Sequence, residues 1–344
     1  MKSLSENSIG ILDGKYILMK NLGEGYSSQV YKVKDSLTNK IYAAKVFNKY
    51  TQSIEKEIEH NKIISQNINT QFPNFIKYIT SSVGPFELKN DSQISDTPET
   101  KAYIIFELGT KGTLLDYITC TKENLDERFV KVIFIKIVKA VRYLHFLGLC
   151  HRDLKTDNIV LSGEEFIIKL LDFGFSSKII KTKDGNAQYQ TEYVGTKEYA
   201  APEIFNGIPY DGEKADIFSL GVILFNLRTG FRGFKIAKCY DPKEVKDKSK
   251  LLYNYIRYKK HKIYWKQLGL YINVNELSEQ FRELYLKMVA YDPNERPTLG
   301  EIFNDDYFDD IRALNDDQLH NLEQEIINEF RIREALIKES KNLT

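Results

Sequence analysis

Cysteine is scarce in this chain of 344 residues, which contains only Cys120, Cys150 and Cys239. No two of them have the spacing of a CxxC metal or redox pair. An odd and sparse set of cysteines is typical of proteins from a reducing compartment. We therefore expect the chain to work in the cytoplasm, with the nucleus as a second location.

Long apolar runs are missing as well. No stretch of about 18 consecutive apolar residues occurs, so we expect no membrane-spanning helix. The first residues contain no apolar core of a signal peptide, and Lys2 excludes N-myristoylation. These absences predict a chain without a membrane partner.

A charge excess of either sign is also lacking, because 49 basic residues face 48 acidic ones. This balance argues against binding to nucleic acid or to an anionic membrane through net charge alone. No EF-hand loop pattern appears, so built-in calcium sensing is not expected. Apolar residues make up 42% of the chain, which indicates a globular protein of two domains or one bilobed unit.

The character of the chain changes from strands to helices along its length. Alternating or β-rich patterns predict strands within 16–47, 75–83 and 103–108, with a helix over 52–65. The polar stretch 87–101 between them predicts an exposed loop.

Helical periodicity dominates the second part of the chain. An apolar stripe covers 126–147, a nearly all-apolar helix is predicted over 216–227, and further helices follow to about residue 311. The tail from Asn315 has an apolar stripe with acidic residues first and lysines last, as the helix dipole favours. We favour packing of this tail on its own domain over a role as a partner-binding helix.

Two short blocks carry the chemistry. Residues 151–158 read His-Arg-Asp-Leu-Lys-Thr-Asp-Asn, and residues 172–174 read Asp-Phe-Gly. Together they supply three carboxylates, a lysine and an amide, which suit the transfer of a phosphoryl group assisted by Mg²⁺. Each residue alone fits a turn, a cap or a core position, so the combination carries the inference.

A glycine loop and a lysine precede these blocks. Gly23 and Gly25 lie between two predicted strands, with Ser28 where a third glycine would be expected. Lys45 sits in an apolar strand 22 positions after Gly23 and needs an anionic partner there. Glu57 on the next helix is the candidate, and Glu59 is the alternative because the register is open.

At these residues the chain resembles the eukaryotic protein kinase family over residues 16–311. Further blocks of the resemblance are Ala43-Ala44-Lys45, Ile105 to Gly109, Gly195-Thr196, Ala201-Pro202-Glu203, Asp216 to Gly221 with Phe218 in place of a tryptophan, and Arg296. The resemblance implies an α+β, bilobed fold with a β-rich N-lobe over 16–108 and a mostly helical C-lobe over 109–311. Residues 1–15 would be an N-terminal extension, and 312–344 a helical tail.

The resemblance also implies an activity: transfer of the ATP γ-phosphate to Ser or Thr hydroxyls of protein substrates, with Mg²⁺ as cofactor. Asp153 would accept the hydroxyl proton, Lys155 would contact the γ-phosphate, and Asn158 and Asp172 would hold Mg²⁺. His151 would be structural. The implied ATP-binding residues are Leu22, Gly23, Gly25, Val30, Ala43, Lys45, Glu57, Glu107, Gly109 and Val160.

Lys155 and Thr196 place the resemblance on the serine/threonine side, in the calcium/calmodulin-dependent-like or Polo/Aurora-like groups. In the activation segment, which the resemblance places from Asp172 to Glu203, Glu192 occupies a position at which the family often has an activating phosphothreonine. We expect Glu192 to replace that phosphate in part, with phosphorylation of Thr191 as the rival. Asp157 is a candidate for favouring a basic substrate residue. The alternative for the whole chain is a pseudokinase scaffold.

Overall fold

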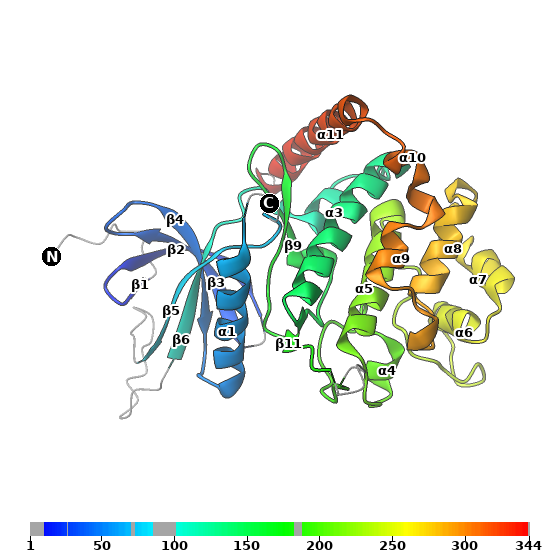
Figure 1. Cartoon of the computed structure of the whole chain (residues 1–344), viewed down its shortest axis with the longest axis horizontal. Coiled ribbons are helices and arrows are strands. Elements are labelled where there is room, and N and C mark those ends of the chain that lie inside the picture. The colour runs from blue at the N-terminus through cyan, green and yellow to red at the C-terminus, as the bar shows by residue number, and fades with distance from the viewer. Residues whose placement is uncertain (1–9, 26, 70–72, 85–100, 182–187, 343–344) are drawn as a thin grey trace. The chain divides into compact units, whose positions relative to one another are not determined.

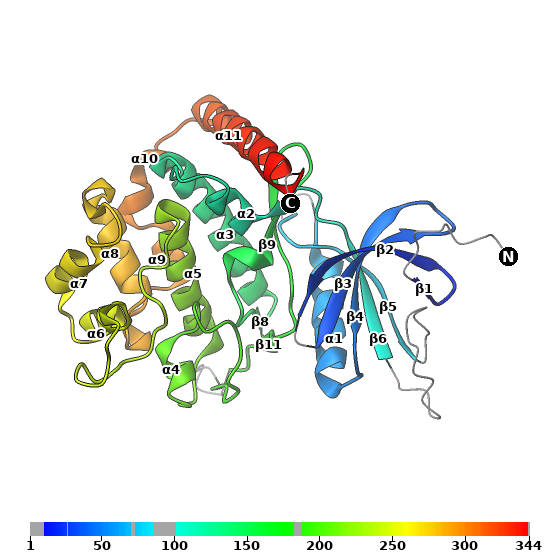
Figure 2. The same ribbon diagram turned by 180° about the vertical axis from the view of Figure 1, so that it is seen from behind.

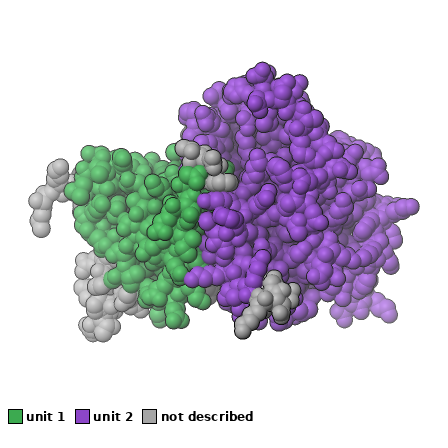
Figure 3. Space-filling model, in the orientation of Figure 1, with its two compact units in different colours: residues 1–110 green, residues 111–344 purple. Residues whose placement is uncertain are grey.

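The computed structural model of the chain describes residues 10–25, 27–69, 73–84, 101–181 and 188–342. Two compact units make up the chain, residues 1–110 and residues 111–344 (Figure 3). The loop predicted over 87–101 lies outside the described residues up to position 100, and so does the 182–187 part of the activation segment.

Unit 1 is built on an antiparallel sheet of six strands in the order β1-β2-β3-β4-β6-β5 (Figure 1). A single long helix, α1, accompanies the sheet in the described part of this unit. The bounds are β1 Gly10–Leu12, β2 Tyr16–Glu24, β3 Ser28–Asp35, β4 Ile41–Phe47, α1 Gln52–Asn67, β5 Tyr78–Gly84 and β6 Lys101–Glu107. Strand β1 comes from residues 1–15 and pairs with β2.

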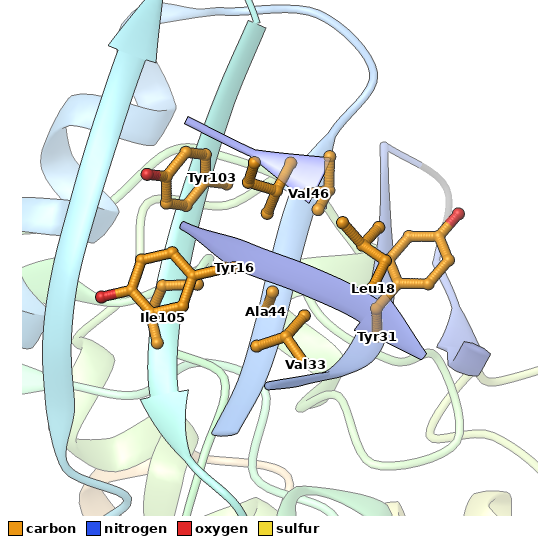
Figure 4. Packing of buried hydrophobic residues seen from close by; sticks show 9 residues of the cluster. Tyr16, Leu18, Tyr31, Val33, Ala44, Val46, Tyr103 and Ile105 are labelled. Carbon is orange, nitrogen blue, oxygen red and sulfur yellow. The ribbon is translucent and has the colours of Figure 1, made fainter. Parts of the chain in front are cut away.

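Strand alternation gives the sheet two different faces. One face carries a buried cluster drawn from β1 to β4 and β6, with Ala44 and Val46 on β4 among its members (Figure 4). The opposite face packs Phe47 and Ile104 against Ile54 and Ile58 of α1. Because side chains alternate along a strand, Lys45 lies on the α1 face between two residues of the first cluster.

Unit 2 is mostly helical (Figure 2). Its helices are α2 Leu114–Thr119, α3 Glu127–Phe146, α4 Pro202–Phe205, α5 Gly212–Thr229, α6 Leu252–Arg257, α7 His261–Leu268, α8 Glu279–Met288, α9 Leu299–Phe303, α10 Asp309–Arg312 and α11 Asp316–Asn342. Short strands complete it: β7 Gly112–Thr113, β8 Leu149–Cys150, β9 Ile159–Ser162, β10 Ile167–Leu170 and β11 Ser177–Lys178. The predicted fold class, a β-rich N-lobe followed by a helical C-lobe, is confirmed.

Helix α5 forms the centre of unit 2. The side chains of its apolar run are buried from Ala215 to Leu227, as expected for a helix without a polar face. Asp211 caps its first turn, and Gly230 ends it in the left-handed conformation at φ +66°. The helix therefore starts four residues earlier than its apolar pattern indicates.

The C-terminal helix α11 packs on unit 2, as we favoured from its apolar stripe. Leu322, Ile326 and Phe330 are buried, and the Phe330 ring lies 5.1 Å from that of Tyr117 on α2. Arg333 is 2% exposed and donates to the backbone oxygen of Tyr117 at 2.9 Å. The buried guanidinium thus has a hydrogen-bond partner on α2, and α11 is part of the folded unit. None of the helices in the described part of the chain combines the length and apolar character needed to cross a bilayer.

Candidate active site

Unit 1 contains the lysine that was singled out in an apolar strand. The Nζ atom of Lys45 on β4 lies 2.7 Å from Oε1 of Glu57 on α1. Their side chains are 14% and 5% exposed, so each charge loses much of its hydration and is compensated by the other. The rival Glu59 is exposed on the same helix. The pair holds an ammonium group in a fixed place where phosphate oxygens could be bound.

The glycine loop joins β2 and β3. Gly23 is still paired with Val30 in the sheet, and the amide of Gly25 donates to the Ser28 oxygen at 2.8 Å. A Cβ atom on Gly25 would lie 3.5 Å from that same oxygen, which is an ordinary van der Waals contact, so the packing of this turn does not by itself require glycine. Ser28, which stands where a third glycine was expected, is buried at the start of β3.

The residues expected around adenine come from several elements. Leu22 on β2 is 47% exposed, whereas Val30 on β3 and Ala43 on β4 are half-buried. At the end of β6, the amide of Glu107 donates to the backbone oxygen of Lys77, and the Oε1 atom of Glu107 accepts from the amide of Lys77. Gly109, two residues later, is half-buried. Val160, on β9 of unit 2, is buried.

The catalytic-loop block in unit 2 is fixed by one buried carboxylate. Asp216 of α5 accepts hydrogen bonds from the amides of His151 and Arg152, both at 2.8 Å. His145 of α3 lies 2.8 Å from the same carboxylate. Burial alone would raise the pKa of Asp216, but the His145 hydrogen bond, both histidines and the His151 amide hold it below its usual value. Asp216 therefore stays ionised at neutral pH.

His151 is engaged on both ring nitrogens by the backbone. Its Nδ1 accepts from the amide of Asp153 at 3.3 Å, and its Nε2 is 3.2 Å from the oxygen of Leu171. The ring also packs at 5.1 Å from that of Phe173. This fully buried histidine therefore connects the two sequence blocks through its contacts with Asp153, Leu171 and Phe173.

Asp153 is the hub of the site. Its Oδ1 accepts from the amide of Thr196 at 2.7 Å, and its Oδ2 lies 3.1 Å from both Asn158 Nδ2 and Lys155 Nζ. Lys155 in turn donates to Oγ1 of Thr196 at 2.7 Å. A carboxylate and an ammonium group are thereby held side by side, with an orientation set by three neighbours. This arrangement can accept a proton and stabilise negative charge at one place.

Gly195 allows the Thr196 segment to come this close. Its φ is +89°, and a Cβ atom would lie 2.5 Å from the backbone oxygen of Arg152. Any other residue would be strained and would push the two segments apart. The glycine in the Gly-Thr pair is therefore required by the close approach of two backbones.

Asn158 and Asp172 emerge from the same end of the β9–β10 hairpin. Ile159 pairs with Leu170, and the backbone amide of Leu171 donates to the backbone oxygen of Asn158 at 3.0 Å. Within the described part of the chain, both hydrogen bonds of the Asn158 side chain use its nitrogen, so its side-chain oxygen could ligate a metal ion. Asp172 adopts a left-handed φ of +64°, a costly conformation that often marks functional residues. An amide oxygen and a carboxylate at one hairpin end fit the hard-oxygen preference of Mg²⁺.

Arg152 binds side chains of the activation segment. Its Nη1 lies 2.6 Å from Glu192 Oε2, 3.3 Å from Gln190 Oε1 and 3.4 Å from the Tyr210 hydroxyl. Burial opposes the charge on Arg152, yet hydrogen bonding to Glu192 helps to hold the pKa of the guanidinium above its usual value. Thr191, the rival position, is exposed.

Glu203 forms a buried ion pair below the segment. Arg296 donates to both of its carboxylate oxygens, at 2.6 and 2.7 Å. The guanidinium is fully buried, and its remaining donors reach the backbone oxygens of Ala290 and Lys214 at 2.9 Å. This pair fixes the end of the activation segment to the loop before α9.

Several residues of the site were not singled out from the sequence. His145, Gln190 and Tyr210 have no local pattern that marks them, because each acts through a partner more than 15 positions away. The paired backbones of Gln190 and Tyr210 bring two of them together. Asp216 lies in one of the blocks of the resemblance, but the sequence did not predict that its carboxylate binds the amides of His151 and Arg152.

Comparisons with known proteins identify the family of the chain. Residues 16–308 match the family model described as Protein kinase domain. The chain is 33% identical to the human SNF-related serine/threonine-protein kinase over 301 residues, which are 86% of this chain and 34% of that protein. It is 30% identical to mouse testis-specific serine/threonine-protein kinase 1 over 289 residues, which are 84% and 70% of the two chains.

The chain thus spans about a third of the length of the SNF-related relative. The relatives carry serine/threonine kinase names and do not decide between the two groups named above. With a family model that covers most of its length, the chain belongs to the protein kinase family, among relatives of the serine/threonine type.

Proposed function

We propose that this chain transfers the γ-phosphoryl group of ATP to Ser or Thr hydroxyls of proteins. The observation that carries the proposal is the hub at Asp153, held by the Thr196 amide and flanked by Lys155. Lys155 also binds the Thr196 hydroxyl, which ties the proton acceptor to the end of the activation segment. Such a hub suits an acceptor hydroxyl on a short side chain.

In this proposal, the acceptor hydroxyl is oriented by Asp153 and gives it a proton as the new bond from its oxygen to the γ-phosphorus forms. The bond from that phosphorus to the β–γ bridging oxygen breaks, and ADP leaves. Lys155 stabilises the charge on the transferred group, and Lys45, fixed by Glu57, binds the α- and β-phosphates. Asn158 and Asp172 would hold Mg²⁺, which supplies charge neutralisation to the phosphates when bound. Leu22, Val30, Ala43 and Val160 would line the adenine, with backbone groups of Glu107 and Gly109 as its polar contacts.

Transfer from γ-labelled ATP tests this function. We expect label on serine and threonine peptides, little on a matched tyrosine peptide, and a requirement for Mg²⁺. The alternative, a pseudokinase scaffold, predicts nucleotide binding without any labelled product. Phosphotyrosine as the main product, or nucleotide binding with no transfer, would refute the proposal.

We also infer that the protein acts in the cytoplasm or the nucleus, on protein substrates and not on nucleic acid or membranes.

We further propose that Glu192 replaces an activating phosphate in part. Its carboxylate lies 2.6 Å from the guanidinium of Arg152, the residue before Asp153. The Glu192 side chain is 55% exposed, so the pair is weaker than a buried one. Tyr210 supports it by donating to the Glu192 backbone oxygen at 3.0 Å. A carboxylate has less charge than a phosphate, so the substitution would give basal activity.

The variant Glu192→Arg should lower kcat/KM on the order of tenfold, because repulsion between like charges replaces the attraction. Initial rates on one serine peptide measure this effect. Glu339→Arg, on exposed α11, is the matched control and should keep the rate of the parent chain. Thr191→Ala should also stay active, and the intact mass of the parent chain should be the same before and after phosphatase treatment. Unchanged rates for Glu192→Arg would contradict the proposal.

A further inference from the structure

One segment of unit 2 has a large positive net charge, and the rest of the chain has a negative net charge of nearly the same size. Residues 232–266, called the basic segment here, contain 12 of the 49 basic residues and 3 of the 48 acidic ones. Its net charge is +9, whereas the remainder of the chain carries −8. The neutral total of the whole chain therefore hides a strong local field.

The aromatic residues of the basic segment anchor it, and its lysines face solvent. Phe234, Tyr253 and Tyr264 are buried, and the rings of Phe234 and Tyr253 lie 4.9 Å apart. Gly233 turns at φ +81°, where a Cβ atom would collide with the Tyr285 hydroxyl. The exposed basic residues are Arg232, Lys235, Lys238, Lys243, Lys246, Lys248, Lys259, Lys260, Lys262 and Lys266. They lie in the segment before α6, in the short connection between α6 and α7, and on α7 (Figure 1).

Few of these charges have a carboxylate close by, although the pKa of Asp247 is lowered by hydrogen bonds from Ser249 and, to a smaller extent, by the nearby Lys235 and Lys250. Within the described residues, Lys259 alone of the basic segment lies within 4.0 Å of a carboxylate, that of Glu295 at 2.5 Å. Asp241 and Asp247 accept from the backbone amides of turns. The ammonium groups of Lys238 and Lys250 both approach the Tyr240 ring, at 5.7 and 5.9 Å. Two like charges at one ring repel each other, and an anionic partner would relieve that repulsion.

The basic segment begins beside the catalytic loop. The Arg232 guanidinium lies 5.8 Å from the centre of the Tyr199 ring, and the Tyr199 hydroxyl is 2.9 Å from Oγ1 of Thr156. Thr156 is three residues after Asp153. A substrate whose acceptor hydroxyl reaches Asp153 would therefore pass one end of the basic segment. This position favours a protein substrate over a lipid surface or RNA as the anionic partner.

We propose that the basic segment binds acidic stretches of the protein substrate and makes this kinase selective for acceptor sites with acidic flanks. The proposal rests on the proposed function for its catalytic readout. Glu and Asp side chains would meet Lys243, Lys246 and Lys248, with Arg232 nearest to the acceptor. Asp157, which is exposed beside this end, would act against that attraction and favour a basic residue close to the acceptor.

The test compares serine peptides that carry a run of six glutamates or six glutamines on either side of the acceptor. We expect the full chain to show a lower KM for an acidic peptide at similar kcat, with the advantage shrinking as salt rises. The triple variant Lys243→Glu, Lys246→Glu, Lys248→Glu should lose on the order of tenfold in that advantage. Turnover of the glutamine peptides should not change. The control triple Lys40→Glu, Lys62→Glu, Lys122→Glu, also exposed, should keep the advantage.

Two results separate this inference from the proposed function. If no peptide is labelled, the proposed function fails, and fluorescence anisotropy of the labelled acidic peptides still tests the basic segment. Equal kcat/KM for both peptide types, or an advantage that the first triple variant retains, would overturn the inference. Binding of phosphatidylserine vesicles or a single-stranded RNA through these lysines, without a preference among peptides, would overturn it as well.

Discussion

Asp153→Asn should lower kcat for phosphoryl transfer by about 10²–10⁴-fold, the usual contribution of a positioned proton acceptor. Asparagine has nearly the same shape, and its oxygen can still accept from the Thr196 amide. Its NH₂ group, however, cannot take a proton. It would also face Lys155 Nζ and Asn158 Nδ2, which donate to the carboxylate in the parent chain. The variant would keep the shape of the site but would lack the group that accepts the proton.

Steady-state rates with varied ATP and varied peptide measure this effect. The KM for ATP should change little, because Asp153 is proposed to act on the acceptor and not on the nucleotide. Glu165→Gln, in the exposed turn between β9 and β10, is a control of matched chemistry and should keep the parent rate. Loss of the Lys155 and Asn158 contacts should cost about 1–3 kcal/mol of stability, so unfolding is followed in parallel. Full turnover by folded Asp153→Asn would place the base elsewhere.

The sequence could predict those features that depend on short spacings. The strands of unit 1 and helix α1 follow from periodicity, and the spacing of residues 151–158 places Asp153, Lys155 and Asn158 in one loop. The family resemblance singled out Thr196 together with Lys155, and the structure shows that Thr196 contacts both Asp153 and Lys155. For the lysine of β4, periodicity left Glu57 and Glu59 open, and the structure places Glu57 beside it.

Contacts between distant positions could not be predicted in the same way. The amides of His151 and Arg152 meet Asp216 across more than 60 positions, and no periodicity encodes such a pair. The apolar stripe of α11 predicts a helix with a buried face, but not that Arg333 ends at backbone oxygens of residues 117 and 123. Packing selects these partners after the local elements have formed.

The second large effect concerns stability. Arg296→Met should lower the free energy of unfolding by about 3–5 kcal/mol, because it leaves the Glu203 carboxylate buried without a cation. The carboxylate is 7% exposed and now receives two charge-assisted hydrogen bonds. The backbone oxygens of Ala290 and Lys214 would also lose their donor. Methionine fills a similar volume, so the loss reports electrostatics more than a cavity.

Denaturant unfolding of single and double variants separates the charge from the packing. Lys259→Met breaks the exposed pair with Glu295, in which the side chains are 67% and 44% exposed, and should cost less than about 1 kcal/mol. Adding Glu203→Met to Arg296→Met should recover part of the loss, because no uncompensated buried charge would remain. If the double variant is less stable than Arg296→Met, an uncompensated buried charge is not the main cost of losing the arginine. Glu203 would then stabilise the end of the activation segment through contacts other than Arg296, and the arginine would act mainly through its backbone hydrogen bonds.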